Sequence, residues 1–321
     1  MQIKQLKGTQ LYVSDLCLGT GNFGAAVNEE QAFALLDEYV EAGGNFLDTA
    51  AVYCSWVTGD NSSEQFIGKW LKSRNAYKEI VIATKGGHYD LKDGKKTSRV
   101  TFKDLESDLD QSLKTLGIEQ IPMYYLHRDN TEKSVEEIID ICESFVKKGK
   151  IQYYAFSNWT KERYMESITI ALQKGIVGPI ALSNQYSLAV PNREMKPMDE
   201  TTVRMEREDI KWVKDSNTTL IPYTSIAGGI FERIHRDSSS LNKAQEEVYL
   251  TKENLDIYEN MRKLNERYGY SMLAISLAFL YAQDCATIPL FASRTKEQLL
   301  GVIEAAKVRL SEEDMRLFSV D

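Results

Sequence analysis

The chain has 321 residues, of which 43% are hydrophobic and 27% charged, and its net charge is −8 at pH 7. A chain of this length can bury a large core in one or two domains. The negative charge argues against nucleic acid as a partner, so an anionic ligand would need local basic residues or backbone donors.

No apolar run approaches the ~20 residues of a membrane-spanning helix, and the stretch 271–281 is a predicted buried helix. The N-terminus has no signal-peptide apolar region. The four cysteines show no CxxC spacing, which indicates neither a zinc site nor a disulfide framework. We therefore expect a cytoplasmic protein without a metal and without nucleic-acid or membrane partners. Its oligomeric state stays open.

Short apolar runs alternate with longer amphipathic segments along almost the whole chain. The predicted strands are 16–19, 45–48, 80–84, 123–127, 151–157, 180–183, 220–223 and 286–290. The clearest helical patterns between them are 29–42, 63–73, 103–116, 135–148 and 161–174. Glycines follow most of these helices, and Thr101 and Thr160 are predicted N-caps.

Eight strand–helix units fit a single-domain (β/α)8 TIM barrel over residues 1–321 better than an open doubly wound sheet. Residues 1–13 precede the first strand and predict a β-hairpin. Two long loops, 189–202 and 226–254, follow strands and would overhang the C-terminal face of the barrel, where active sites form. A final helix is predicted over 311–318.

Polar residues suited to proton transfer stand at or just after the ends of predicted strands. Asp48 and His127 end the second and fourth strands, and Lys85 directly follows the third. Tyr53 lies in the loop after Asp48. These groups could together donate a proton to a carbonyl oxygen while hydride arrives from a bound nicotinamide. Each residue alone also has a structural explanation, namely capping, packing, solvation or a satisfied core histidine.

In residue type, order and strand context, these four residues resemble the Asp-Tyr-Lys-His tetrad of the aldo-keto reductase superfamily. The resemblance implies that Tyr53 is the general acid and that Asp48 holds Lys85 charged. A phenol with a pKa near ~10 is a weak acid, and a neighbouring ammonium would lower that pKa. His127 would orient the substrate carbonyl. The resemblance also implies that the N-terminal hairpin closes the bottom of the barrel.

No G-x-G-x-x-G follows the first strand, so a Rossmann nucleotide site is unsupported. The resemblance instead implies that Ser157 and Asn158 bind the nicotinamide carboxamide, although Asn158 could simply cap the next helix. The strand-six glutamine of the family corresponds to Ser183 or, with a one-residue deletion, to Gln185, which we favour. The other residues that the resemblance assigns to this half of the cofactor are Gly19, Thr20, Asp48, Tyr223, Thr224, Ile226 and Gly228.

The segment 288–299 resembles the family's adenosine-binding segment. Arg294 stands at a predicted helix start, which is a good anion site, next to Ser293 and four residues before Gln298. A guanidinium there favours a 2′-phosphate and therefore NADP(H) over NAD(H). However, Gly301-Val302 replaces a Glu-Asn pair of the family, so NAD(H) stays possible. As a surface helix start, the segment would need no function.

The expected substrate side comprises Phe23, Trp56, His127 and Arg128. Trp159 and His88 would lie at the pocket mouth, and His88 and His235 are expected to be solvated. Arg128 could attract an anionic or hydroxyl-rich substrate, or could pair with Asp129.

We therefore expect an NADP(H)-dependent reductase of aldehyde, ketone or sugar-like carbonyls. The alternative is a nicotinamide-binding redox sensor or partner-binding subunit with slow or no turnover. Assaying NADPH oxidation with an aldehyde panel would separate the two functions.

Overall fold

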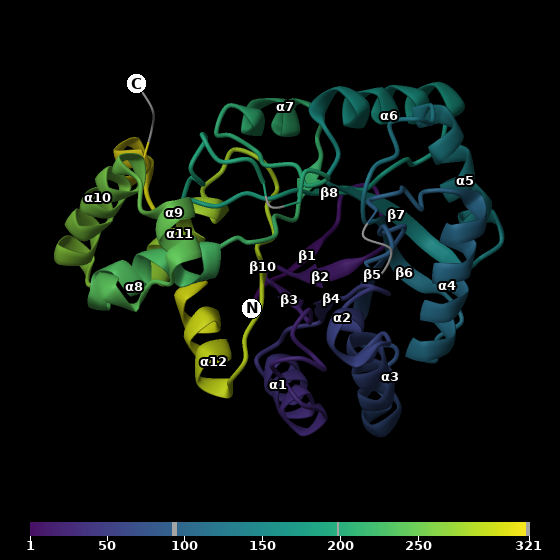
Figure 1. The fold of residues 1–321 in the computed structure, drawn as a ribbon, viewed down its shortest axis with the longest axis horizontal. Coiled ribbons are helices and arrows are strands. Elements are labelled where there is room, and N and C mark those ends of the chain that lie inside the picture. Colours follow the sequence, from purple (N-terminus) through teal and green to yellow (C-terminus); the bar gives the residue numbers. More distant parts are fainter. Residues whose placement is uncertain (92–94, 198, 319–321) are drawn as a thin grey trace.

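The computed structural model describes residues 1–91, 95–197 and 199–318. Its main sheet contains β3 (Cys17–Gly19), β4 (Phe46–Asp48), β5 (Val81–Gly86), β6 (Ile121–Leu126), β7 (Ile151–Ser157), β8 (Ala181–Ser183), β9 (Thr219–Leu220) and β10 (Leu290–Phe291). All neighbouring strands are parallel, in the order β10-β3-β4-β5-β6-β7-β8-β9 (Figure 1). The (β/α)8 class is confirmed, and each predicted strand overlaps an observed one, although 220–223 and 286–290 do so only at Leu220 and Leu290.

Hydrogen bonds join the two ends of this sheet. The amide of Leu220 in β9 donates to the carbonyl of Ala286 (2.8 Å), and the amide of Ile288 donates back to Leu220 (2.9 Å). Leu220 also pairs in parallel with Thr287, just before β10. Residues 286–288 of the predicted strand therefore pair with β9, although they lie outside β10. The sheet curls and closes, as expected for a barrel.

Helices surround the sheet (Figure 1). They are α1 (Glu29–Glu41), α2 (Ser55–Thr58), α3 (Ser62–Arg74), α4 (Phe102–Leu116), α5 (Val135–Lys147), α6 (Lys161–Lys174), α7 (Asp209–Asp215), α8 (Ile230–Asp237), α9 (Lys243–Tyr249), α10 (Lys252–Tyr268), α11 (Met272–Tyr281), α12 (Lys296–Ala305) and α13 (Glu312–Met315). Thr101 and Thr160 cap α4 and α6 as predicted, by accepting from the amides of Asp104 and Arg163. Gly117 and Gly175 end these helices with positive φ, which glycine adopts at little cost.

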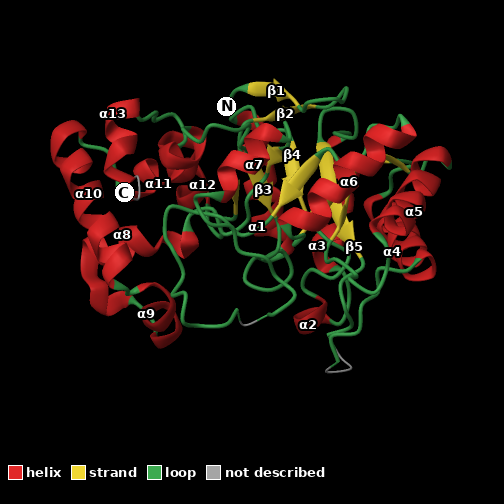
Figure 2. Cartoon of the chain, turned by 90° about the horizontal axis from the view of Figure 1, so that it is seen from above, coloured by secondary structure: helices red, strands yellow, loops and turns green. Residues whose placement is uncertain are grey.

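The N-terminal hairpin consists of β1 (Ile3–Gln5) and β2 (Tyr12–Ser14), which pair antiparallel. Its buried side chains Leu6, Leu11 and Val13 belong to the same apolar cluster as Phe46 and Met123 of the barrel. The hairpin lies at one end of the barrel, and α2 with the long connecting loops lies at the other (Figure 2). The expected closure of the barrel bottom is confirmed.

The prediction of a second long loop over 226–254 is wrong. It forms η1 (Ala227–Gly229), α8, η2 (Ser238–Ser240), α9 and the start of α10. Local sequence explains this, because Ile230 and Phe231 bury one side of α8 and a capping box at Asn242 starts α9. The loop predicted at 189–202 lacks regular structure where it is described, and residue 198 within it lies outside the described residues.

The buried helix predicted over 271–281 is α11, in which eight of the ten residues are buried. The predicted final helix consists of α13 followed by η3 (Arg316–Phe318). Within the described ranges, no helix combines the length and the apolar character that crossing a membrane requires.

Candidate active site

Three tetrad side chains meet at the carboxyl end of β4 and β5. The ammonium nitrogen of Lys85 lies 2.5 Å from Oδ1 of Asp48, 2.9 Å from the carbonyl oxygen of Thr49 and 3.2 Å from the phenolic oxygen of Tyr53. An ammonium has three hydrogens to donate, so these three acceptors satisfy it fully. Asp48 is 1% and Lys85 3% exposed. Asp48, Tyr53 and Lys85 therefore lie together, as we predicted from the sequence.

The backbone after β4 explains the position of Tyr53. The chain stays hydrogen-bonded beside β5 through the amides of Thr49 and Ala51, which donate to Ala83 (2.9 Å) and Lys85 (3.1 Å). It then turns, and the amide of Tyr53 donates to the carbonyl of Ala50 (3.0 Å). This turn brings the phenol of Tyr53 to the ammonium of Lys85.

His127 directly follows β6, and its amide donates to the carbonyl of Gly86 (2.9 Å). Its ring centroid lies 5.8 Å from that of Tyr53, at an interplanar angle of 78°. Burial, and then the positive charge of Arg128, lowers the pKa of His127 well below its usual value. The imidazole is therefore neutral and carries one N–H, which suits a hydrogen bond to a carbonyl oxygen.

The electrostatics differ from the expectation at Tyr53. Burial raises the pKa of the Tyr53 phenol above its ordinary value, because desolvation outweighs the opposing effect of Lys85. Burial also acts to lower the pKa of Lys85, but Asp48 and Tyr53 raise it above its ordinary value. The resting site therefore holds a protonated phenol beside an ammonium, and the expected net lowering of the Tyr53 pKa is wrong for this state.

Ser157 and Asn158 connect the ends of three neighbouring strands. The Ser157 hydroxyl donates to the carbonyl of Ser183 (2.8 Å), and Nδ2 of Asn158 donates to the carbonyl of His127 (3.2 Å). The Tyr223 hydroxyl donates to Oδ1 of Asn158 (2.6 Å). Asn158 adopts a left-handed conformation (φ 61°) and leaves the capping of α6 to Thr160. Its alternative role as a helix cap is therefore wrong.

Within the described part of the chain, twelve buried side-chain polar atoms have no hydrogen-bond partner. Three of them belong to residues that the resemblance connects with the cofactor: Oδ2 of Asp48 and the hydroxyls of Ser183 and Ser293. An unpaired buried polar atom is costly, and a ligand bound at the strand ends would give these three a partner. Gln185, which we favoured over Ser183, pairs through its backbone with Val203 (3.0 Å) and Met205 (2.9 Å). Ser183 thus carries the free hydroxyl of this pair.

The segment after Pro222 has an unusual backbone. Thr224, Ala227, Gly228 and Gly229 all have positive φ (56°, 47°, 65° and 74°). Ile226 lies between them and is half-buried. The amides of Ala227 and Gly229 donate to the carbonyls of Thr224 and Ile226 (both 2.8 Å). The segment that the resemblance assigns to the cofactor is therefore a series of tight, hydrogen-bonded turns.

Packing explains Gly19 and Thr20. A Cβ at Gly19 would lie 2.8 Å from a side-chain carbon of Leu290 and 3.1 Å from the carbonyl oxygen of Phe291, so glycine favours the close pairing of β3 with β10. The hydroxyl of Thr20 is buried and donates to the carbonyl of Asp48 (2.9 Å). Both residues therefore shape the backbone beneath Asp48.

The loop before α12 carries the residues assigned to the adenosine end. Thr295 caps α12 by accepting from the amide of Gln298. The Gln298 side chain accepts from the amide of Arg294 (2.9 Å), which holds the loop against the helix start. Arg294 is exposed, whereas the neighbouring Lys296 forms an ion pair with Glu38. Arg294 is thus placed where it can meet an anion.

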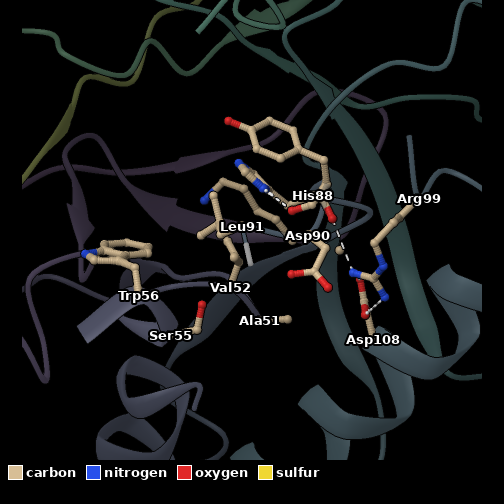
Figure 3. A pocket seen from close by; sticks show the side chains of 12 residues that line it. Ala51, Val52, Ser55, Trp56, His88, Asp90, Leu91, Arg99 and Asp108 are labelled. Carbon is tan, nitrogen blue, oxygen red and sulfur yellow. Dashed lines mark hydrogen bonds and ion pairs between the residues drawn. The ribbon is translucent and has the colours of Figure 1, made fainter. Parts of the chain in front are cut away.

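A cavity of about 530 Å³ lies next to the tetrad (Figure 3). It is lined by Ala51, Val52, Ser55, Trp56, Lys85, Gly86, His88, Tyr89, Asp90, Leu91, Arg99 and Asp108. Trp56 stands on one side, and the ion pair of Arg99 and Asp108 (2.6 Å) stands on the other (Figure 3). The space combines an aromatic wall with a polar wall and reaches Lys85. It can hold a small organic molecule.

Two aromatic residues expected at the pocket mouth lie in the core instead. Phe23 is 1% exposed within an apolar cluster, and Trp159 is fully buried. Trp159 stacks on Phe156 with ring centroids 3.9 Å apart. Both predictions are wrong because a loop tryptophan or phenylalanine gains more from packing than from lining a wet surface.

Arg128 does not pair with Asp129. Its guanidinium lies 2.8 Å from the carboxylate of Asp199 and donates to the hydroxyl of Thr201 (2.7 Å). Asp129 pairs with Arg163 at 2.5 Å. Arg128 therefore holds the loop after β8 against β6, and nothing in the local sequence around Arg128 indicated Asp199 as its partner.

We expected His88 to be solvated, but it is only 8% exposed. Its ring centroid lies 4.7 Å from that of His127. His235 is exposed on α8, as predicted, and lies 3.2 Å from the hydroxyl of Tyr258. The position of His88 beside the tetrad could have been inferred from the sequence, because His88 stands three residues after Lys85.

Comparison with known proteins identifies relatives over the full barrel. A family profile described as "Aldo/keto reductase family" matches residues 15–319. The "Uncharacterized oxidoreductase YrpG" of Bacillus subtilis is 28% identical over 99% of this chain and 95% of its own length. The "Putative aryl-alcohol dehydrogenase AAD14" of Saccharomyces cerevisiae is 28% identical (96% and 83%). The "Aldo-keto reductase yakc [NADP(+)]" of Schizosaccharomyces pombe is 25% identical (92% and 84%).

Proposed function

Because the chain belongs to the aldo/keto reductase family, we propose that it reduces aldehyde, ketone or sugar-like carbonyls to alcohols with NADP(H). The observation that carries this proposal is the contact between the phenol of Tyr53 and the ammonium of Lys85, which is itself paired with buried Asp48. A cavity beside Lys85 offers space for the substrate. The substrate is a small molecule, and the four cysteines, none of them in a disulfide, suit a cytoplasmic location.

The chain's residues fit a nicotinamide cofactor at the carboxyl ends of the strands. Asn158, Ser157 and the free hydroxyl of Ser183 would hold the carboxamide, and Asp48 offers its unpaired oxygen nearby. When bound, the reduced cofactor supplies hydride to the carbonyl carbon. Ser293 and Arg294 would hold the adenosine end, where a guanidinium suits a 2′-phosphate. The relative named for NADP(+) supports that choice.

The proton comes from the chain itself. Tyr53 donates its phenolic proton to the carbonyl oxygen as that oxygen becomes negative, and the ammonium of Lys85 stabilises the phenolate that remains. Asp48 keeps Lys85 charged in a site with little access to water. Neutral His127 donates a hydrogen bond to the same carbonyl oxygen and so fixes its direction. Each role uses a group in the protonation state that the site favours at rest.

The test is to mix purified protein with NADPH and a panel of aliphatic, aromatic and sugar aldehydes and to follow NADPH absorbance. We expect steady turnover with at least one aldehyde. Binding of NADPH followed by one turnover per protein and no steady state would contradict catalysis and support a redox sensor. An absence of NADPH and NADH binding would refute both functions.

A further inference from the structure

His88 is a buried imidazole that lines the cavity. It stands three residues after Lys85, lines the cavity and packs against the catalytic imidazole of His127, with ring centroids 4.7 Å apart and an interplanar angle of 72°. The proposed reaction leaves this side chain without a role. Its ring lies where it can contact a group bonded to the carbonyl that His127 would orient.

The backbone around His88 fixes its position. Gly87 has φ of 76°, and its amide donates to Asp108 (2.9 Å). The positive φ favours glycine at this turn, and a Cβ at Gly87 would also lie 2.9 Å from a side-chain carbon of Leu105. Arg99 also donates to the carbonyl of His88 (3.2 Å). The turn and the guanidinium together hold the ring at the cavity wall.

The tautomer of His88 follows from its own hydrogen bond. Nδ1 lies 2.9 Å from the carbonyl oxygen of Tyr89, and a carbonyl can only accept, so Nδ1 carries the hydrogen. In a neutral ring, Nε2 is then an acceptor. Burial, and then the positive charge of Arg128, lowers the pKa of His88 to about 4, so the ring is neutral near pH 7. His88 therefore presents an acceptor, and its partner must be a donor.

We propose that His88 determines specificity by accepting a hydrogen bond from a hydroxyl on the carbon next to the reacting carbonyl. The preferred substrates are then α-hydroxy aldehydes and α-hydroxy ketones, the class that includes small sugars. The two histidines bind different groups of the substrate. His127 donates to the carbonyl oxygen, and His88 accepts from the adjacent hydroxyl. The polar wall formed by Arg99 and Asp108 suits further hydroxyls, and Trp56 offers an apolar face to the C–H groups opposite. This inference rests on the proposed carbonyl reduction.

The experiment compares 2-hydroxypropanal with propanal, which differ only in the α-hydroxyl. For the wild-type protein with NADPH, we expect kcat/KM to be about tenfold higher for 2-hydroxypropanal, the value of one hydrogen bond. His88→Phe keeps a ring but removes the acceptor, so the ratio of the two kcat/KM values should fall to near one. His88→Gln restores an acceptor and should recover a severalfold preference. His235→Phe, the same change at an exposed histidine, should keep the wild-type ratio.

The outcomes separate the inference from the function on which it rests. Equal kcat/KM values for both aldehydes in the wild type, or an unchanged ratio in His88→Phe, would overturn the role of His88 and leave carbonyl reduction intact. Loss of the preference in both His88→Phe and His88→Gln, with NADPH affinity and melting temperature retained, would also count against an acceptor role. No reduction of either aldehyde by a wild-type protein that does not bind NADPH would refute the proposed function, and the inference with it.

Discussion

The ammonium nitrogen of Lys85 lies 3.2 Å from the phenolic oxygen of Tyr53, in a site where Lys85 is only 3% exposed. The electrostatic attraction between opposite charges grows as water is excluded, so the ammonium acts most strongly when the phenol has lost its proton. Burial keeps Tyr53 protonated at rest. In the proposed reaction, Lys85 would then stabilise the phenolate that proton transfer leaves. The pair is suited to release a proton only during the reaction.

Replacing Tyr53 with phenylalanine tests this assignment. The change removes the proton donor and keeps most of the ring packing, so we expect kcat for carbonyl reduction to fall by about 10²–10⁴-fold. NADPH affinity, measured by quenching of protein fluorescence, should stay close to wild type. Turnover near the wild-type rate in a preparation free of other reductases would contradict the role of Tyr53.

Replacing Lys85 with methionine tests the buried ion pair through stability. The change leaves the Asp48 carboxylate buried without its cation, which should cost about 3–5 kcal/mol of unfolding free energy in urea. Adding Asp48→Asn should recover part of this loss, because the unpaired charge is removed. The control Lys69→Met breaks an exposed pair with Glu29 and should cost less than about 1 kcal/mol. An equal loss in both single variants would contradict a tightly coupled buried pair.

The barrel and the tetrad could be predicted because both depend on local patterns. Each central strand is a short apolar run. Because the strands are parallel, their last residues all lie at the C-terminal end of the barrel. Asp48 and Lys85 therefore meet although 37 residues separate them. Helix caps such as Thr160 follow the same logic, since their effect is confined to one turn.

The errors concern residues whose surroundings come from distant segments. Arg128 pairs with Asp199, 71 residues away in an irregular loop, and no periodic pattern connects the two. Trp159 follows a strand end as a substrate-facing residue might, but its ring turns inward onto Phe156. The pKa of Tyr53 could not be predicted either, because its direction depends on how completely the loops exclude water.

Chelation tests the expectation that no metal takes part. The proposed reaction uses a phenol as the acid and an ammonium for charge stabilisation, and both are poor metal ligands. We therefore expect full activity after exhaustive dialysis against EDTA. Activity that disappears on chelation and returns with a divalent ion would contradict the proposed chemistry.

The two neighbouring histidines should make stability depend on pH. In the folded protein the pKa of His88 is about 4, below the usual value of 6.5, and that of His127 is also lowered. Below pH 6.5, and above the lowered pKa of the folded protein, each histidine is protonated in the unfolded chain but not in the folded one. The free energy of unfolding therefore falls as pH falls, by up to ~1.4 kcal/mol per pH unit for each histidine.

Urea unfolding of wild type and His88→Phe at a series of pH values from 6.5 downward measures this effect. The carboxylates titrate in both proteins, so the difference in slope reports on His88 and on its effect on the neighbouring His127. We expect the slope of unfolding free energy against pH to be shallower in His88→Phe by one proton. Equal slopes would mean that His88 titrates alike in the folded and the unfolded protein, which would contradict a pKa lowered by burial.

The final prediction concerns Arg294 and cofactor choice. A charge-assisted hydrogen bond to a 2′-phosphate contributes about 1.5–3 kcal/mol, so Arg294→Ala should weaken NADPH binding by about one to two decades and barely change NADH binding. Lys296→Ala is the matched control. Lys296 stands two residues further along and is paired with Glu38, so its loss should alter neither affinity. Fluorescence titration of both cofactors decides between the outcomes. If Arg294→Ala weakened both cofactors equally, Arg294 would bind a part that they share, and if it weakened neither, the preference for NADP(H) would need another cause.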